Sequence, residues 1–453
     1  MIKRLTSFFH KGDKDSSFVV KKSALALFVR LGGMITQYLF IFIVARLYGP
    51  KEQGAFTICF TILQLFAIFS QMGLDNRLTR IIAAHKDQAD PTIIKTTYLQ
   101  SLQLTLFASS IWAIATFFTA PFIAGTIFSK PEITDELQQT CMAFVPFVVI
   151  GLNSAGYRGF KNMTGFMIFR TVQPLLSAIL LLVLFYMKSN WGVVHAYTYA
   201  TLGTCLMSFI TWWRFSKMKQ GVYQPILNWN QMLSESLPMM LTGSMIFIMG
   251  WTDNLILGIF RTSEEVGMYD AAYKLSTLSA LVLFAFNAIQ APVFSELYHK
   301  KEMGRLQNII IKSNRLLFFT SLPLTLLLCF FPDTILGFLG EGFKGAWIAL
   351  ILLAIGNFIN SISGSIGILL QMSGHQKEYN KIITSTAIGS IILNFILIPK
   401  FGLLGAAISS SSAKIIQNLF SVVFAKKHLG IISIYVPGIE KLNMLRTKNR
   451  QNN

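Results

Sequence analysis

The chain has 453 residues, of which 53% are hydrophobic and only 13% are charged, and its mean hydropathy is +0.55. A soluble core of ordinary composition cannot bury so much apolar surface, which excludes an ordinary soluble protein and predicts one that lies in a bilayer. The net charge of +19 comes from side chains spread over short turns without a recognition motif. We therefore expect contact with anionic membrane lipids and no nucleic-acid binding.

Twelve apolar runs are long enough to cross a membrane, since a spanning helix needs about 20 mostly apolar residues. They lie at 24–47, 54–74, 97–120, 137–156, 166–187, 193–213, 237–259, 266–290, 314–331, 346–368, 380–399 and 402–425. A further run at 431–436 is too short to span. No apolar stretch precedes Ala24, so we do not expect a cleavable secretion signal. The four cysteines lie inside apolar runs without paired spacing, so we expect neither a disulfide nor a metal site, and we predict no cofactor.

The Lys and Arg residues are distributed unequally between the two sides of the predicted membrane. The tails and alternate turns hold 29 of them, and the turns on the opposite side hold six: Lys51, Lys130, Lys188, Arg261, Lys344 and Lys400. Cytoplasmic segments retain positive charge during insertion. The sequence therefore predicts a multi-pass protein of the cytoplasmic (inner) membrane with both termini in the cytoplasm.

The first two runs carry polar residues inside apolar sequence. Arg30 lies about two turns inside the first run, and Gln37 follows on the same helix face. An ionised group in hydrocarbon costs a few kcal/mol, so Arg30 either faces a water-filled cavity, which we favour, or extends to the nearby cytoplasmic surface. In the second run Gln64 and Gln71 share a face. They either line that cavity or hold helices together.

The junction between the first two runs recurs later in the chain. The same pattern stands at 45–56 and at 258–269: an apolar run ends, a charged turn carrying Glu follows, and the next run begins with Gly and an aromatic residue. The corresponding glycines, Gly54 and Gly267, are 213 positions apart. Gly156 and Gly367 match at an offset of 211, and 191–196 and 401–406 match at 210. Three anchors at nearly constant offset predict two equivalent halves.

Each predicted half holds six spanning helices, and an even number makes both halves enter from the same side as parallel repeats. The predicted organisation is a cytoplasmic arm at 1–22, a first lobe at 23–213, a linker at 214–233, a second lobe at 234–427 and a cytoplasmic tail at 428–453. The predicted fold class is an all-α polytopic membrane protein with about twelve transmembrane helices in two parallel six-helix lobes.

Two acids and a lysine interrupt the seventh and eighth runs. Asp253 lies about one and a half turns from the outer end of its helix, and Asp270 and Lys274 are four residues apart in the next, a spacing that lets them pair on one face. Two alternatives stay open. Asp270 and Lys274 either satisfy each other, or one acid stays available for coupling to protons.

The tenth and twelfth runs add a second polar region. Asn357 lies on a face of small and polar residues that either lines a cavity or lets helices approach closely. Lys414 lies near the middle of the last run with Gln417 one turn away, and it has no acidic neighbour in the sequence. We interpret Lys414 as a cation that faces a cavity.

Arg30, Lys274 and Lys414 come from both halves, with fewer acids at comparable depth. They predict a basic chamber between the repeats. The natural ligand of such a chamber is an anion, and a phosphate or diphosphate would compensate several buried cations at once.

Three stretches carry a resemblance to a known family. The junction from Ala45 through Tyr48, Gly49 and Pro50 to Gly54 resembles the first-loop signature of polysaccharide-export proteins in the multidrug/oligosaccharidyl-lipid/polysaccharide (MOP) superfamily. The stretches 253–258 with 266–269 and 394–399 with 401–407 resemble the same proteins, so the likeness covers nearly the whole chain. It implies a MATE-like pair of lobes that form a V, and alternating access through a cationic central cavity.

Within that superfamily the chain looks like a Wzx-type flippase, which is not an enzyme. The resemblance implies a substrate of undecaprenyl-diphosphate-linked oligosaccharide, moved across the membrane for O-antigen, capsule or exopolysaccharide assembly, with a polymerase and glycosyltransferases as pathway partners. By charge and depth, Arg30, Lys274 and Lys414 are the candidates for the diphosphate, and Asp253 and Asp270 are candidate coupling or ion-pair acids.

Two alternatives belong to other functional classes. One is an ion-coupled small-molecule antiporter of the MATE type, but an exporter of organic cations needs acids rather than bases in its cavity. The other is a membrane polymerase or ligase acting on lipid-linked sugars. The predicted outer turns are short, and no paired carboxylates, nucleophile with base, metal ligands or glycine-rich phosphate loop accompany them.

Overall fold

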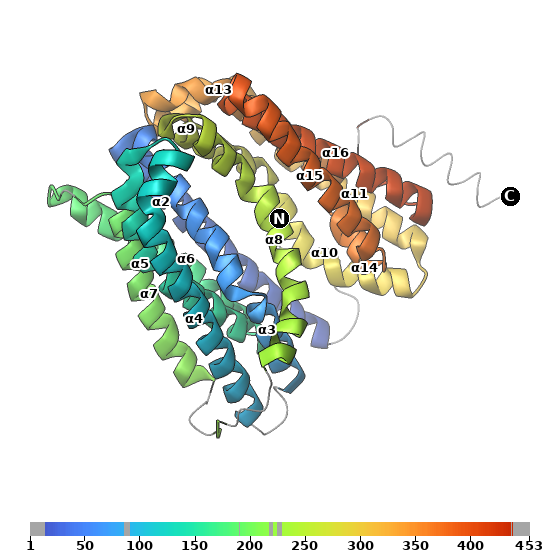
Figure 1. Ribbon diagram of the computed structural model, residues 1–453. Helices are drawn as coiled ribbons and strands as arrows, with labels where there is room; N and C mark the ends of the chain where they lie inside the picture. The colour runs from blue at the N-terminus through green and yellow to red at the C-terminus, as the bar shows by residue number, and fades with distance from the viewer. Residues whose placement is uncertain are drawn as a thin grey trace.

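The computed structural model describes residues 14–85, 91–189, 191–216, 221–223, 229–435 and 437, and for 14–31 it describes the backbone alone. Within these ranges every regular element is a helix. The helices form two arms that diverge from a common end, where α9 and α13 lie, and α8 runs between the arms (Figure 1). The arrangement is a V.

The first arm contains the helices from the amino-terminal part of the chain, which pack closely on one another. They are α2 (Lys14–Gln71), α3 (Leu74–His85), α4 (Pro91–Phe122), which continues as η1 (Ile123–Ile127), then the turn η2 (Pro131–Ile133), α5 (Thr134–Gly159), α6 (Met163–Tyr186) and α7 (Val193–Phe215).

The remaining helices form the second arm and the link between the arms. They are α8 (Trp229–Phe260), α9 (Ser263–Thr277), η4 (Leu278–Ala280), α10 (Leu281–His299), α11 (Met303–Phe330), α12 (Pro332–Leu339), η5 (Glu341–Ala346), α13 (Trp347–Ser363), α14 (Ile366–Met372), α15 (Gln376–Phe401) and α16 (Leu403–Leu429).

Eight helices in the described residues are long and apolar enough to cross a membrane, beginning with Gly32–Gln71. These eight account for nine of the twelve predicted runs, because the first of them covers two. The other three runs lie in α8, in α9 with α10, and in α16. The run 266–290 is divided because α9 ends after 15 residues at the turn η4. In α16 the polar run of Ser409–Ser412 and Lys414 lowers the hydropathy.

The bend in α2 separates its two predicted runs. The backbone leaves the helical conformation at Gly49 (φ 78°, ψ −177°), and Pro50 follows. A positive φ favours glycine, and proline lacks the N–H that would continue the helical hydrogen bonds. We call this end of the molecule the apex. It also holds the junction between α8 and α9 at Arg261 and Thr262.

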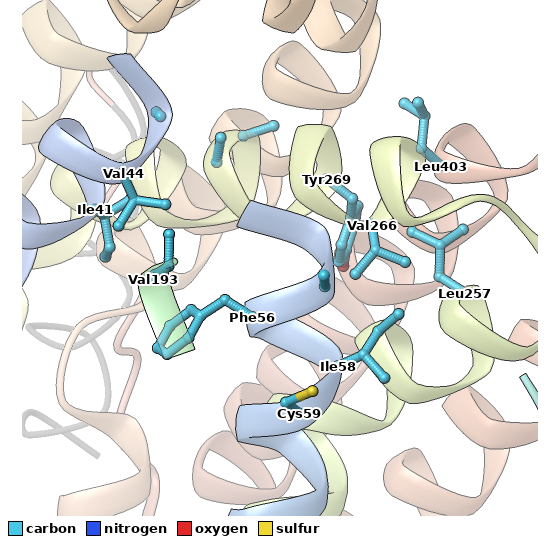
Figure 2. Packing of buried hydrophobic residues seen from close by; sticks show 14 of the residues in the cluster. Ile41, Val44, Phe56, Ile58, Cys59, Val193, Leu257, Val266, Tyr269 and Leu403 are labelled. Atoms are coloured by element: carbon cyan, nitrogen blue, oxygen red, sulfur yellow. The ribbon is translucent and has the colours of Figure 1, made fainter. Parts of the chain in front are cut away.

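The apex is held by one core that draws on both arms. Ile58 of α2, Leu257 of α8 and Val266 of α9 are at most 1% exposed and belong to the same buried cluster. Figure 2 shows these side chains between the α2 ribbon and the ribbons of the second arm. In a bilayer, close packing holds helices together through van der Waals contacts, so the core makes the apex the firm joint of the V.

The repeat anchors take equivalent positions in the two arms. Gly192 precedes α7 and Gly402 precedes α16, each as the residue before the first helical one. The junction glutamates point at these glycines. A Cβ on Gly192 would lie 3.7 Å from Glu52 Oε2, and one on Gly402 would collide with Glu265 Oε2. Each Glu therefore faces the start of the last helix in its own half.

Two segments of the predicted organisation overlap helices of the structure. α2 begins at Lys14, inside the segment 1–22 that we expected to be a cytoplasmic arm. The linker 214–233 overlaps the start of α8 at Trp229, and its residues 217–220 and 224–228 lie outside the described ranges. The lobe boundaries themselves stay a prediction.

Candidate functional site

An ion pair lies on α9, where the two arms meet below the apex. Lys274 Nζ donates to Asp270 Oδ2 at 2.6 Å, one helical turn away. The Asp270 side chain is 1% exposed and that of Lys274 is 19% exposed. Of the two alternatives left by the sequence, the structure has Asp270 and Lys274 paired with each other. The Asp270 side chain is therefore the inner partner, and the Lys274 side chain is the more accessible one.

The first arm supplies neutral polar groups to this pair. Gln53 of α2 is buried and donates from Nε2 to Asp270 Oδ2 at 3.1 Å. Tyr38, also of α2, donates to the backbone oxygen of Lys274 at 3.0 Å, and its hydroxyl lies 2.6 Å from Thr277 Oγ1. The ion pair is thus part of a hydrogen-bonded contact between the arms.

Lys274 and Tyr38 reach the wall of a cavity of about 450 Å³. The other lining residues come from α2, α9, η4, α10 and α12 and are apolar: Met34, Ile35, Ile41, Phe42, Ala271, Leu275, Leu278, Leu281 and Leu339. Ile35 is 67% exposed, so the cavity is open to the outside of the molecule at α2. It combines apolar walls with one ammonium group.

Asp253 of α8 forms a second buried cluster, within the second arm. Its carboxylate accepts hydrogen bonds from Tyr269 of α9 at 2.8 Å, from Asn394 of α15 at 2.5 Å and from Ser410 of α16. The side chain is nearly inaccessible. Charge-assisted hydrogen bonds of this kind satisfy a buried carboxylate, and here they fix α8 against three other helices.

Lys414 of α16 lies near Asp253. Its Nζ donates to Asn357 Oδ1 of α13 at 3.0 Å and lies 4.7 Å from the centre of the Tyr273 ring. Asn357 in turn donates to Ser276 Oγ at 2.9 Å. Lys414 also interacts electrostatically with Asp253. The acidic neighbour that the sequence around Lys414 lacks comes from another helix.

The remaining predicted site residues lie around this centre or apart from it. Gln417 donates to the Tyr379 hydroxyl at 3.4 Å. Gln64 is half-buried in α2, and Gln37 is exposed. Arg30 belongs to α2, but its side chain lies outside the described residues. The structure therefore brings Lys274, Lys414 and the two acids together around α9.

Sequence reasoning missed the groups that connect these charges, namely Gln53, Tyr38, Tyr269 and Tyr273. For Gln53 the internal repeat carried a signal. At the offset of 213 its counterpart is Val266, so a polar residue stands in one copy where the other has a buried aliphatic one. The tyrosines gave no such signal, because aromatic residues are abundant throughout the chain.

Comparison with known proteins agrees with the predicted fold class. The chain matches a solved inward-facing multidrug resistance MATE family transporter of the MOP superfamily with a TM-score of 0.72, at 15% identity, covering 89% of this chain and 98% of that one. It matches the lipid II flippase MurJ in an inward closed conformation with a TM-score of 0.70, at 16% identity, covering 89% and 87%. The prediction of an all-helical, MATE-like membrane fold is confirmed.

The sequence comparisons narrow the assignment further. A curated relative, the probable low-salt glycan biosynthesis flippase Agl15 of Haloferax volcanii, is 23% identical over 413 residues, which cover 90% of this chain and 84% of the relative. A family model described as polysaccharide biosynthesis protein matches residues 19–298, more than half of the chain. This multi-pass membrane protein therefore belongs to the polysaccharide biosynthesis protein family.

Proposed function

We propose that this protein moves undecaprenyl-diphosphate-linked oligosaccharide units across the cytoplasmic membrane by alternating access, for O-antigen, capsule or exopolysaccharide assembly. The observation that carries the proposal is the position of Lys274. Lys274 lines an otherwise apolar cavity between the arms, and its ammonium is bound to Asp270. A ligand with a prenyl chain and a diphosphate matches both properties.

The chemistry of the cavity supports a lipid-linked anion. Apolar walls let a prenyl chain from the bilayer lie against the protein without meeting polar groups, and an ammonium pairs with a phosphate oxygen through a charge-assisted hydrogen bond. Lys414 supplies a second cation near the same helix, and we assign Arg30 as a third on the strength of its charge and place in α2. The relative Agl15 is itself described as a glycan flippase.

The shape of the molecule supports a rocking mechanism. α7 ends at Phe215 and α16 ends at Leu429, both away from the apex. With both termini on the cytoplasmic side, as the charge distribution predicts, the V opens toward the cytoplasm. The head group enters there, the arms rock about the apex, and the prenyl chain stays in the membrane.

Asp253 is our candidate for the coupling acid. It joins α8, α9, α15 and α16 through the hydrogen bonds of one carboxylate, with Lys414 as the nearby cation. A proton or metal cation bound at this carboxylate would alter those bonds, and thereby the packing of the second arm. Asp270 is already bound to Lys274, so we assign it to the substrate region.

The test is transport by variants that lose one cation at a time. Arg30→Ala, Lys274→Ala and Lys414→Ala are expressed in cells that lack the protein, and the lipid-linked oligosaccharide in each leaflet is measured. We expect each variant to reach the membrane in normal amounts and to accumulate the substrate in the cytoplasmic leaflet. Normal transport by all three variants would overturn the proposal.

The MATE-like fold is also compatible with a second function, that of a multidrug antiporter. The fold does not separate the two functions, because a MATE transporter and a lipid flippase match about equally well. Charge separates them, because the described lining of the cavity includes Lys274 and no carboxylate that could pair with an organic cation. Efflux of a cationic dye such as ethidium, unchanged by loss of the protein, is the result we expect. Dye efflux that depends on the protein would favour the antiporter.

A further inference from the structure

We infer that Asp270 is an internal competitor of the substrate. Its carboxylate occupies the Lys274 ammonium while the cavity is empty and gives that ammonium up to the diphosphate of the incoming lipid. This inference rests on the proposed function, because it concerns the same cavity. The inference explains why Asp270 lies beside Lys274, since a site that only binds phosphate needs no acid there.

The geometry makes exchange of partners feasible. Asp270 is 1% exposed, so it approaches Lys274 from the protein side, while the 19% exposed lysine reaches the cavity wall. Lys274 lines the cavity and Asp270 does not, so a phosphate oxygen arriving from the cavity meets the lysine side chain first. A diphosphate carries more negative charge than one carboxylate, so it attracts the Lys274 ammonium more strongly than Asp270 does.

The exchange has a consequence for the contact between the arms. After Lys274 turns to the diphosphate, Asp270 keeps Gln53 of α2 as its donor. A buried carboxylate that loses its counter-ion is strongly destabilised. Gln53 also holds an amide oxygen, Oε1, that is buried without a hydrogen-bond partner among the described residues. Loading of the cavity therefore weakens the α2–α9 contact, the largest contact between the two arms.

The other groups that face Asp270 do not replace the lost cation. Tyr38 of α2 and Tyr273 of α9 interact with it electrostatically and are neutral as phenols. Lys414 of α16 lies over the Tyr273 ring and is hydrogen-bonded to Asn357, and Asp253 of α8 is its nearby acid. The charge balance at Asp270 thus depends on Lys274, which makes the acid sensitive to what the cavity contains.

The test measures binding of farnesyl diphosphate to the purified full-length protein in detergent. Asp270→Asn keeps the shape of the side chain and an acceptor for Gln53 but removes the competing charge. We expect its affinity to rise by about tenfold, the factor that corresponds to roughly 1.4 kcal/mol of competing ion pairing. Asp270→Ala removes the same charge and replaces Asp270→Asn in the binding measurement if Asp270→Asn does not fold. Transport by Asp270→Asn should nevertheless slow, because loading no longer weakens the contact between the arms.

A double-mutant cycle separates this inference from the proposed function. Lys274→Met should weaken binding, and Asp270→Asn added to it should change binding no further. If Lys274→Met leaves binding unchanged, the proposed site itself fails. If Lys274→Met weakens binding but Asp270→Asn does not strengthen it, the site stands and the competition is overturned. Inorganic diphosphate, run in parallel, shows whether the effect needs the prenyl chain; a rise with either probe supports the competition.

A matched control is available on α10. Glu296 and Lys300 have the same spacing and the same 2.6 Å separation as Asp270 and Lys274, but both side chains are more than half exposed. Glu296→Gln makes the same change of charge outside the cavity. We expect it to leave the affinity for farnesyl diphosphate unchanged. An equal rise in Glu296→Gln would mean that net charge alone produces the effect, which overturns the inference.

Discussion

Gly54 of α2 and Gly267 of α9, which occupy equivalent places in the two sequence repeats, pack directly against each other at the apex. A Cβ added to Gly54 would collide with the Ser263 carbonyl and lie 2.9 Å from the Gly267 nitrogen. One added to Gly267 would collide with the Pro50 carbonyl and lie 2.9 Å from the Gly54 nitrogen. The same residue of each half thus lets the two backbones touch, so the joint of the V is built from the repeat itself.

Alanine at either glycine should therefore open the apex. A Cβ there meets backbone rather than a movable side chain, and overpacking of this kind costs at least about 1–3 kcal/mol. We predict that Gly54→Ala and Gly267→Ala lower the melting temperature in detergent and reduce transport. Gly203→Ala on α7 is the control, since no atom lies within 4 Å of its added Cβ. Unchanged melting in both apex variants would contradict the role of this contact.

The sequence predicted the elements of the site better than their connections. Spacing alone predicted that Asp270 and Lys274 can pair, because both lie on one helix. The repeat identified Gly54 and Gly267 as equivalent, but an offset along the chain does not show that the two residues touch. The neighbours of Lys414 could not be predicted, because Asn357, Tyr273 and Asp253 come from three other helices. Those contacts depend on how the helices cross, which local sequence does not encode.

An ion-pair cluster fastens α8 to the first arm at the end away from the apex. Arg77 of α3 is 1% exposed and lies 3.2 Å from Glu235 of α8, and Arg80 lies 2.9 Å from the same carboxylate. Next to this cluster the backbone at Gly73 lies close to the backbone of α8, since a Cβ on Gly73 would collide with the Ser236 carbonyl. α8 is therefore held by the first arm there and by the second arm at Asp253.

Removing the shared acid should cost far more than removing the outer arginine. Glu235→Gln leaves the buried Arg77 without its carboxylate, a loss of about 3–5 kcal/mol for a buried pair. Arg80 is 55% exposed, and a surface ion pair contributes roughly 0–1 kcal/mol to stability. Arg80→Ala should therefore change the free energy of unfolding little. Chemical or thermal unfolding in detergent measures both. Equal losses in the two variants would contradict the buried role of Arg77.

Lys130 forms a second contact between the arms, close to the apex. Its buried ammonium donates to Phe128 O at 3.0 Å and to Gly258 O near the end of α8. Burial lowers the pKa of Lys130 below its ordinary 10.5, against the raising effect of Glu132 and Glu265. Between that lowered pKa and 10.5 the unfolded chain binds more protons at this lysine than the folded chain does.

Stability should therefore rise with pH across that window because of Lys130. We predict that the melting temperature of the wild type, followed from neutral pH to 10.5, contains a rising contribution that Lys130→Met lacks. Lys344→Met is the control, because Lys344 is 43% exposed and forms a surface pair with Glu341. The comparison is the difference in slope between variants, since other groups titrate equally in all of them. Parallel curves for wild type and Lys130→Met would refute the prediction.

The segment after α16, residues 431–435, lies against α11 and the end of α13. Gln307 of α11 donates to Ile432 O at 2.7 Å and accepts from Ile432 N at 2.8 Å, and Asn314 donates to Ser433 O. Ile431 and Tyr435 are buried. Residues 431–435 of the run that was too short to span a membrane therefore pack on the second arm, and we call them the strap.

Loss of the paired amide contacts should release this strap and destabilise the second arm. Gln307→Ala leaves one backbone donor and one acceptor of Ile432 without partners, a loss of about 1–3 kcal/mol. We predict a lower melting temperature and faster protease cleavage after α16. Asn308→Ala, a change at the neighbouring exposed position, should leave both unchanged. Cleavage at the wild-type rate in Gln307→Ala would show that apolar packing of Ile431 and Tyr435 alone holds the strap.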